Sequence, residues 1–456
     1  MVVITISDAN IKLMRSPLSS RVALVSLKRA GRGGLVEAVE KRVEEMRYFD
    51  IPAYPCGASE FLYLPYFEAK PCAFREGNEP DTTREYARVN NHGSRELIVH
   101  PEYVFPGKPG WAIRVMDNKY PLTDKVDFVT NHAYDSHRLS DGFIEMMDAR
   151  GKDYVIVSSP HHIVTANRID FENIALLEQI FTKRELEDPD ILYVCVGSNN
   201  AGLPRKILPP FMRDVHLDAL IRYMAKLEEV ASKNGGIPKE AEGIAEESKK
   251  TLDILLRNSN GYYESIGIIS GASQAHVHKR VLSLPIHPPW IEEGYIRTEQ
   301  KATTNGRASF YDYVKKEELL IEEGKYFALI ADPVPEFSGG LLVIARDRQN
   351  IVEMDRAELA ELGSLRKLGR VMHEILYGGL PSNDYMIQTF KEDCLKYPNT
   401  RFNLSLVPRK SVQAFLELGT KIVGLDGDSK ELASTMRYLK ERISHKIYQS
   451  GLENEV

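Results

Sequence analysis

Cysteine is scarce in this sequence: the 456 residues include four, at Cys56, Cys72, Cys195 and Cys394. No two of them form a C-x-x-C pair, and so few in so long a chain exclude a disulfide framework and favour a reducing, cytoplasmic location. Uninterrupted apolar runs of about 18 residues are also missing, so we expect no transmembrane helix. Residues 1–20 lack the apolar core of a secretory signal peptide.

A surplus of basic residues is absent as well. Lys and Arg number 59 against 65 Asp and Glu, which gives a formal net charge of -6 at pH 7. Nucleic-acid-binding domains usually carry a basic surplus, so this balance argues against that class of protein. A local phosphate pocket is still compatible with it, because such a pocket needs only a few basic residues. The content of 43% hydrophobic and 27% charged residues is ordinary for a globular protein.

Hydrophobic patterning predicts strands in pairs, with helices between the groups. Segments rich in β-branched and aromatic residues predict strands at 22–26, 96–100, 111–116, 154–157, 266–269, 276–284, 326–330, 341–345 and 403–407. Helical periodicity predicts helices at 34–47, 214–234, 240–257, 355–377 and 431–448, and residues 50–90 are predicted to be loop. Paired strands favour an α+β fold, with antiparallel sheets flanked by helices, over a parallel βαβ sheet.

The most informative segment is Gly-Ala-Ser-Gln-Ala-His-Val-His-Lys-Arg at 271–280. His276 and His278 are two residues apart, so on a strand they point to the same face. The preceding glycine allows close backbone approach and free amides for a phosphate. Imidazole suits attack on phosphorus, because near pH 7 it is mostly neutral and has a lone pair. A lone H-x-H is more often two ordinary histidines, but this context favours a nucleophile.

Several motifs occur in an order that resembles one known family. They are G-A-S-x-x-H-x-H at 271–278, Ser-Leu-Lys-Arg-Ala-Gly-Arg at 26–32, Cys-Ala-Phe-Arg-Glu-Gly-Asn-Glu at 72–79, the Trp-to-Pro segment at 111–121, Ser-Pro-His-His at 159–162, the strand at 404–408 and Phe-Leu-Glu-Leu-Gly-Thr at 415–420. Together they resemble the galactose-1-phosphate uridylyltransferase family, the transferase branch of the histidine-triad superfamily.

The resemblance implies two histidine-triad-like halves, residues 1–300 and 301–456. The first half would carry the active-site strand, with insertions near 34–70 and 185–260. The stretch 193–200 could compete for the strand before the active site, so its register stays open. A cytoplasmic homodimer in carbohydrate (galactose) metabolism, acting on UDP-hexose such as UDP-glucose and on hexose 1-phosphate without a cofactor, follows from the same resemblance. Neither a nucleic acid nor a membrane is an expected partner.

The resemblance also implies a role for each matched residue. His278 would attack the α-phosphorus of a UDP-sugar and pass UMP to a second sugar 1-phosphate in a ping-pong reaction. His276 would support the strand. The expected substrate-binding residues are Arg29 and Arg32 for the phosphates, Asn118 and Lys119 for ribose and uracil, Ser273 and Gln274 for the transferred phosphoryl group, and Glu417 for sugar hydroxyls.

Three departures from the family pattern bear on the chemistry. Arg280 stands where family members usually have Gln, and a guanidinium there could contact phosphoryl oxygens. The structural zinc site of the family would match Cys72, Arg75, His162 and His276, and because a guanidinium cannot ligate zinc, we predict no bound metal. The second H-x-H of the family is also missing, since residues 401–405 contain no histidine.

Two other functions stay open at this point. A related adenylyl transferase or phosphorylase would use the same histidine chemistry on an ADP-sugar or a dinucleoside polyphosphate. A non-catalytic nucleotide-binding protein is the third possibility, suggested by Arg280 and by the incomplete metal ligands. The nucleobase, the hexose and the use of phosphate as acceptor are not fixed by the sequence.

Overall fold

The computed structural model describes the greater part of the chain. The described residues are 11–15, 22–26, 73–74, 76–91, 96–104, 109–123, 150–161, 165–200, 276–286, 288–304, 310–377, 382–386, 396–409, 422–425 and 429–452.

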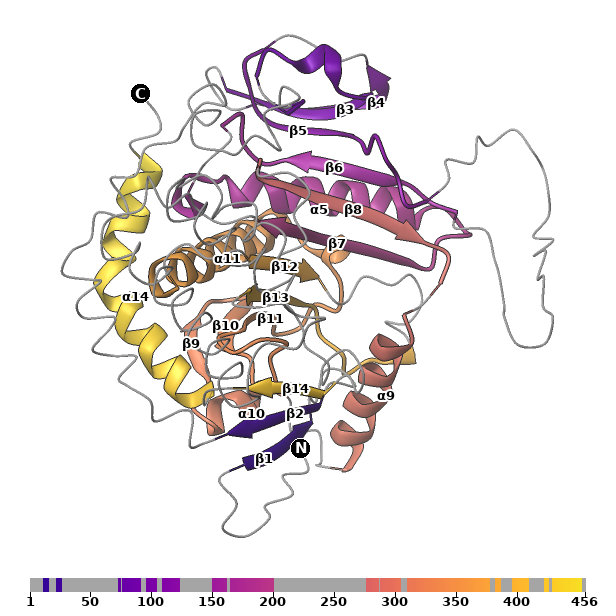
Figure 1. Ribbon diagram of the computed structural model, residues 1–456. Coiled ribbons are helices and arrows are strands. Elements are labelled where there is room, and N and C mark those ends of the chain that lie inside the picture. Colours follow the sequence, from indigo (N-terminus) through magenta and orange to yellow (C-terminus); the bar gives the residue numbers. More distant parts are fainter. Residues whose placement is uncertain are drawn as a thin grey trace, which may run out of the picture.

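One sheet of 11 strands forms the centre of the molecule (Figure 1). Its order is β4-β3-β5-β6-β8-β7-β12-β13-β11-β10-β9, and neighbouring strands are antiparallel throughout. The earlier part of the chain contributes β3 (Glu85–Asn90), β4 (Leu97–Val104), β5 (Trp111–Asp117), β6 (Asp153–Val157), β7 (Tyr193–Asn200) and β8 (His278–Leu284). The later part contributes β9 (Leu320–Glu323), β10 (Phe327–Ala331), β11 (Leu341–Ala345), β12 (Ser382–Met386) and β13 (Asn403–Pro408).

The two parts of the sheet meet at β7 and β12. Their register pairs Ser382 with Asn200 and Tyr385 with Gly197. The sheet therefore continues across the boundary between the two halves expected from the sequence. β7 belongs to the segment that fits the family pattern poorly, yet it lies at the middle of the sheet, between β8 and β12.

A second, three-stranded sheet joins distant parts of the sequence. It contains β1 (Ile11–Arg15), β2 (Val22–Ser26) and β14 (Ile422–Leu425). β1 pairs antiparallel with β2, whereas β14 pairs parallel with β2. In Figure 1 this small sheet lies at the bottom of the view, so residues near the start of the sequence lie beside residues near its end.

Three long helices cover one face of the large sheet. They are α5 (Phe171–Leu186), α11 (Arg356–Leu376) and α14 (Ser429–Leu452). Their apolar residues share one core with every second residue of the strands, for example Ile156, Val281 and Leu329. This alternation follows from the two-residue period of a strand. Burial of this continuous apolar layer is the main driving force for docking the helices onto the sheet.

Two further helices cover parts of the opposite face. α10 (Phe310–Lys316) places Val314 against Ile330 and Leu342, which point away from the main core. α9 (Pro289–Thr304) packs Ile291 and Tyr295 against Tyr193 of β7.

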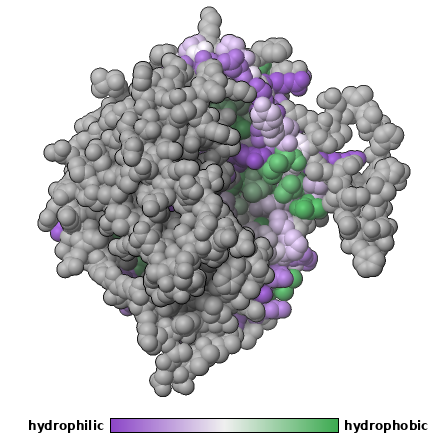
Figure 2. Space-filling view, viewed as in Figure 1, coloured by the Kyte–Doolittle hydropathy of each residue, from purple (hydrophilic) through white to green (hydrophobic). Residues whose placement is uncertain are grey.

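The surface drawn in Figure 2 carries hydrophobic and hydrophilic side chains side by side at the right of the view. None of the helices in the described part is both long and apolar enough to cross a membrane.

The predicted α+β class is confirmed, and several element boundaries agree closely. The strands predicted at 22–26 and 341–345 match β2 and β11. The capping box at the start of α11 is also confirmed: the Glu358 amide donates to Asp355 Oδ1 at 2.9 Å and the Asp355 amide donates to Glu358 Oε2 at 2.7 Å.

Three expectations differ from the structure. Residues 85–90, predicted as loop, form β3, whose residues are buried beside β5 although the preceding segment is rich in turn-forming residues. The strand predicted from 276 begins at His278. The helices α5, α9 and α10 and the strands β9, β12 and β14 had no prediction. The strand predicted at 266–269 and the helices predicted at 34–47, 214–234 and 240–257 lie outside the described residues.

The contact between α5 and α11 requires a glycine, which gives a test of the fold. A Cβ added to Gly363 would lie 2.8 Å from the amide nitrogen of Glu172 and 2.9 Å from the carbonyl carbon of Phe171. Backbone atoms cannot move aside, so we expect Gly363→Ala to lower the free energy of unfolding by about 1 to 3 kcal/mol, despite the better helix propensity of alanine. Urea denaturation measures this change.

Gly369 of the same helix provides the matched control. Its added Cβ would meet Leu406 Cδ1, the end of a side chain, at 2.5 Å, and a side-chain end shifts at less cost than backbone atoms do. Gly369→Ala should therefore destabilise the protein clearly less than Gly363→Ala. Equal effects of the two substitutions would contradict the close approach of the helices.

Candidate functional site

Strand β8 displays two kinds of residue on its two faces. His278, Arg280, Leu282 and Leu284 are half-buried, and the residues between them are buried. β6 and β7 flank β8 on its two sides, so β8 is an interior strand with both edges hydrogen-bonded. The half-buried face therefore holds His278 and Arg280 on a rigid support, as the alternation in the sequence predicted.

The ring of His278 has a defined hydrogen bond. Its Nδ1 lies 2.8 Å from the carbonyl oxygen of His276. A carbonyl oxygen can only accept, so Nδ1 carries the proton and the lone pair of the neutral ring is on Nε2. The ring of Phe74 packs beside it, with 5.5 Å between the ring centroids. The orientation and the tautomer of His278 are thus set by its own strand.

His276 has a different environment from His278. It precedes β8, is 1% exposed, and its Nε2 donates to the carbonyl oxygen of Ser159 at 2.7 Å. The next residue, Val277, also contacts this segment: its carbonyl oxygen accepts from the Ser158 amide at 3.1 Å. These bonds tie the start of β8 to the end of β6. The supporting role expected for His276 stays a prediction.

Arg280 is bound to a buried carboxylate. Its Nε donates to Asp153 Oδ1 at 3.0 Å, and its Nη2 donates to Asp153 Oδ2. The Arg280 side chain is 34% exposed, whereas that of Asp153 is fully buried. The Nδ2 of Asn118 and the amide of Leu122 also donate to Asp153 Oδ2, each at 3.1 Å.

Asn118 and Lys119 follow directly after β5. The Asn118 amide donates to the carbonyl oxygen of Asp153 at 2.8 Å, and Asn118 Oδ1 accepts from the Tyr120 amide at 3.0 Å. Lys119 is exposed. The structure therefore brings Asn118 and Arg280 together around one carboxylate, and places Lys119 beside them in the sequence at the surface.

The other expected site residues lie outside the described residues. These are Arg29, Arg32, Ser273, Gln274 and Glu417, and, among the positions matching the zinc ligands, Cys72, Arg75 and His162. Within the described ranges, no three His, Cys, Asp or Glu side chains are grouped so that they could hold a metal ion.

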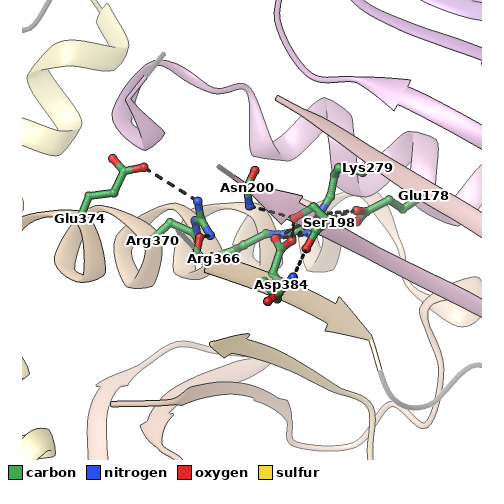
Figure 3. Close-up of polar contacts among 10 residues, drawn as sticks. Glu178, Ser198, Asn200, Lys279, Arg366, Arg370, Glu374 and Asp384 are labelled. Atoms are coloured by element: carbon green, nitrogen blue, oxygen red, sulfur yellow. Dashed lines mark hydrogen bonds and ion pairs between the residues drawn. The ribbon is translucent and has the colours of Figure 1, made fainter. Parts of the chain in front are cut away.

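Four charged side chains form a cluster around Lys279, on the buried face of β8 (Figure 3). Lys279 Nζ lies 3.0 Å from Asp384 Oδ2 on β12 and 3.2 Å from Glu178 Oε1 on α5. Arg366 on α11 bonds both carboxylates, at 2.9 Å to Glu178 Oε2 and 2.7 Å to Asp384 Oδ2. All four side chains are at most 3% exposed. We call these residues the ion cluster.

The ion cluster continues into further polar contacts. Ser198 donates to Asp384, and Arg370 bonds Ser382 and lies 3.9 Å from Glu374 Oε1. Burial raises the pKa of Glu178 to about 7; the nearby Asp384 carboxylate adds to this shift and the Arg366 guanidinium opposes it. Glu178 is therefore the member of the cluster whose charge changes near neutral pH.

Sequence reasoning missed several of these residues. Asp153 and the members of the ion cluster have no local sequence motif. Their partners are distant in the sequence: Lys279 and Asp384 are 105 residues apart, and Arg280 and Asp153 are 127 residues apart. Asn199 was missed too: it directly follows Ser198, which pairs with Lys279, and Asn383 donates to its Oδ1. Of these residues, only Asn199 lies in a segment, 193–200, whose strand-like pattern could have drawn attention to it.

The chain is similar in sequence and in fold to proteins that are already known. The chain matches none of the protein-family models. It is 21% identical over 354 residues to the ADP-glucose phosphorylase of Arabidopsis thaliana, a match that covers 76% of each chain.

Solved structures give longer matches. The ADP-glucose phosphorylase of Arabidopsis thaliana with bound ADP-glucose has a TM-score of 0.59 at 18% identity, covering 94% of this chain and 98% of that one. A GalT-like protein from the same plant gives 0.57 at 17%, covering 93% and 98%. A uridylyltransferase mutant gives 0.51 at 14%, covering 78% and 99%. The chain thus has the fold of the galactose-1-phosphate uridylyltransferase-like proteins, and the resemblance drawn from its motifs is confirmed.

The raised pKa of Glu178 predicts a pH dependence of stability. The folded state binds the Glu178 proton more tightly than the unfolded chain, because the pKa changes from 4.5 to about 7 on folding. This contribution to stability is complete below about pH 4.5 and is lost as the pH rises to 7. Relative to Glu178→Gln, the parent should lose on the order of 1 kcal/mol of unfolding free energy per pH unit between about pH 5 and 7.

Urea denaturation at a series of pH values measures this difference. Glu172→Gln, at an exposed position of the same helix, is the control and should follow the parent at every pH. A parent curve parallel to that of Glu178→Gln across this window would show that Glu178 does not titrate there.

Proposed function

We propose that this chain is a nucleotidyltransferase in which His278 Nε2 carries a nucleotidyl group between a nucleotide sugar and a phosphate-bearing acceptor. The supporting observation is the bond from His278 Nδ1 to the His276 carbonyl oxygen, which leaves the lone pair on Nε2 at a half-buried position. The same bond stabilises the ring as attack makes it positively charged, because hydrogen bonds from charged donors are stronger than neutral ones.

The proposed reaction has two displacements at one phosphorus. In the first, Nε2 attacks the α-phosphorus, the nitrogen–phosphorus bond forms, and the bond to the sugar 1-phosphate oxygen breaks. In the second, an oxygen of the acceptor phosphate attacks the same phosphorus and the nitrogen–phosphorus bond breaks. A neutral imidazole needs no general base for the first step, so one residue with the right tautomer suffices as nucleophile.

UDP-hexose with hexose 1-phosphate as acceptor is the substrate pair that the motifs suggest, with UDP-glucose as the donor to test first. An ADP-sugar with phosphate as acceptor is the second candidate, because the curated relative and a structural neighbour that covers most of the chain are ADP-glucose phosphorylases, the latter with bound ADP-glucose. A non-catalytic nucleotide-binding protein is the third, and the orientation of His278 argues against it.

The remaining assignments are part of the same proposal. Arg29, Arg32, Ser273 and Gln274 would bind phosphate oxygens, Glu417 the sugar, and Asn118 with Lys119 the ribose and base. Asn199, which follows the residue paired with Lys279, would add an amide that donates to a phosphoryl oxygen. Two histidine-triad-like halves, a homodimer and a cytoplasmic location are proposed on the resemblance alone.

An isotope-exchange assay tests the function. A covalent intermediate allows labelled glucose 1-phosphate to enter UDP-glucose or ADP-glucose when no other acceptor is present. We expect exchange into at least one of the two nucleotide sugars with the parent protein, and a loss of at least about 10⁴-fold with His278→Ala, since no described neighbour can replace the nitrogen nucleophile.

His276→Ala is the matched comparison. Because His276 acts through the strand, its removal should slow exchange by about 10- to 100-fold rather than abolish it. Exchange that persists in His278→Ala would exclude the proposed mechanism. Equal and complete loss in both variants would contradict their separate roles.

A further inference from the structure

Asp153 is a charged residue in an unusual place. Its side chain is fully buried, yet its two oxygens accept from Arg280, Asn118 and the Leu122 amide. The proposed function places one of these partners, Asn118, at the ribose and base, and the family pattern places the other, Arg280, within reach of the phosphoryl oxygens. A buried carboxylate is stable only when its charge is paired and its oxygens are hydrogen-bonded, and both conditions are met here.

The sheet register shows where Asp153 holds the guanidinium. Val157 pairs with His278, Val155 with Arg280, and Asp153 with Leu282. Asp153 therefore lies further from His278 along the strands than Arg280 does. The Nε–Nη2 edge of Arg280 faces Asp153, so the guanidinium leans away from His278 toward the carboxylate that Asn118 also binds, and the Arg280 side chain stays 34% exposed.

The pair also determines the charge of this face. A guanidinium stays protonated at any physiological pH, so Arg280 alone would be a permanent cation beside the nucleophile. The Asp153 carboxylate cancels that charge at hydrogen-bond distance. Interior charges interact far more strongly than charges in water, so this cancellation changes the field that a bound nucleotide meets.

We propose that Asp153 is a positioning residue of the nucleotide site: it fixes Arg280 beside Asn118 and cancels its charge, so that Arg280 offers donors to an anionic nucleotide without acting as a net cation. The inference rests on the proposed function and concerns the same site. A net cation would bind the nucleotide sugar and the covalent intermediate about equally, and such uniform binding slows release without accelerating the chemical step.

The test measures nucleotide binding by calorimetry, with UDP-glucose and ADP-glucose as probes, in the His278→Ala background so that no turnover occurs. Asp153→Asn uncovers the guanidinium charge and should tighten binding of the recognised nucleotide sugar about tenfold. Arg280→Gln leaves the carboxylate and should weaken binding about tenfold. The double variant is neutral again and should bind within about threefold of the parent.

A surface pair provides the control. Asp190 lies 3.6 Å from Arg150 and is 39% exposed, so Asp190→Asn removes an ion pair of the same type outside the site. It should leave both dissociation constants unchanged. A purely structural role of Asp153 predicts weaker binding in both single variants and the weakest in the double variant, and that pattern would overturn the proposal.

A variant that fails to fold, and a failure of the proposed function, can each be distinguished from a failure of this inference. If Asp153→Asn does not fold, as judged by its thermal transition, the comparison of Arg280→Gln with the double variant decides: the double variant must bind more tightly, and equal or weaker binding overturns the inference. If the His278→Ala parent binds neither nucleotide sugar, the inference also fails. Isotope exchange with intact His278 then shows independently whether the proposed function survives.

Discussion

The salt bridge between Lys279 and Asp384 is the interaction on which the site depends most. It joins β8, which carries His278, to β12 of the later part of the chain, and Glu178 and Arg366 extend it to α5 and α11. Removal of one partner from a buried ion pair typically costs about 3 to 5 kcal/mol, because the other charge stays in the interior without compensation. The ion pairs therefore hold β8 in place only when both parts of the sheet are assembled.

The alternation of β8 separates support from chemistry. Lys279 and Val281 point into the layer covered by the long helices, while His278 and Arg280 point to the opposite face. A shift of register by one residue would exchange these faces and bury His278. The ion cluster resists such a shift, because Lys279 finds its two carboxylates in one register only. Asp153 has the corresponding function for Arg280 on the reactive face.

The sequence allowed much of the local structure to be predicted. β-branched runs located β2 and β11, a capping pair located the start of α11, and the strand predicted at 276–284 corresponds to β8. β3 and α5 were missed, because the burial that stabilises them comes from neighbours elsewhere in the chain. The ion cluster and the Arg280–Asp153 pair could not be predicted for the same reason: 105 residues separate Lys279 from Asp384, and 127 separate Arg280 from Asp153.

The covalent intermediate on His278 is the central claim, and the mass of the intact protein tests it most directly. The protein is incubated separately with UDP-glucose and with ADP-glucose. The reaction is quenched at alkaline pH to preserve a phosphoramidate, and the intact mass is measured by mass spectrometry. We predict one added UMP or one added AMP per chain. This adduct should be absent from His278→Ala and should be lost when sugar 1-phosphate or phosphate is supplied. An unchanged mass with both nucleotide sugars, or an adduct that persists in His278→Ala, would contradict it.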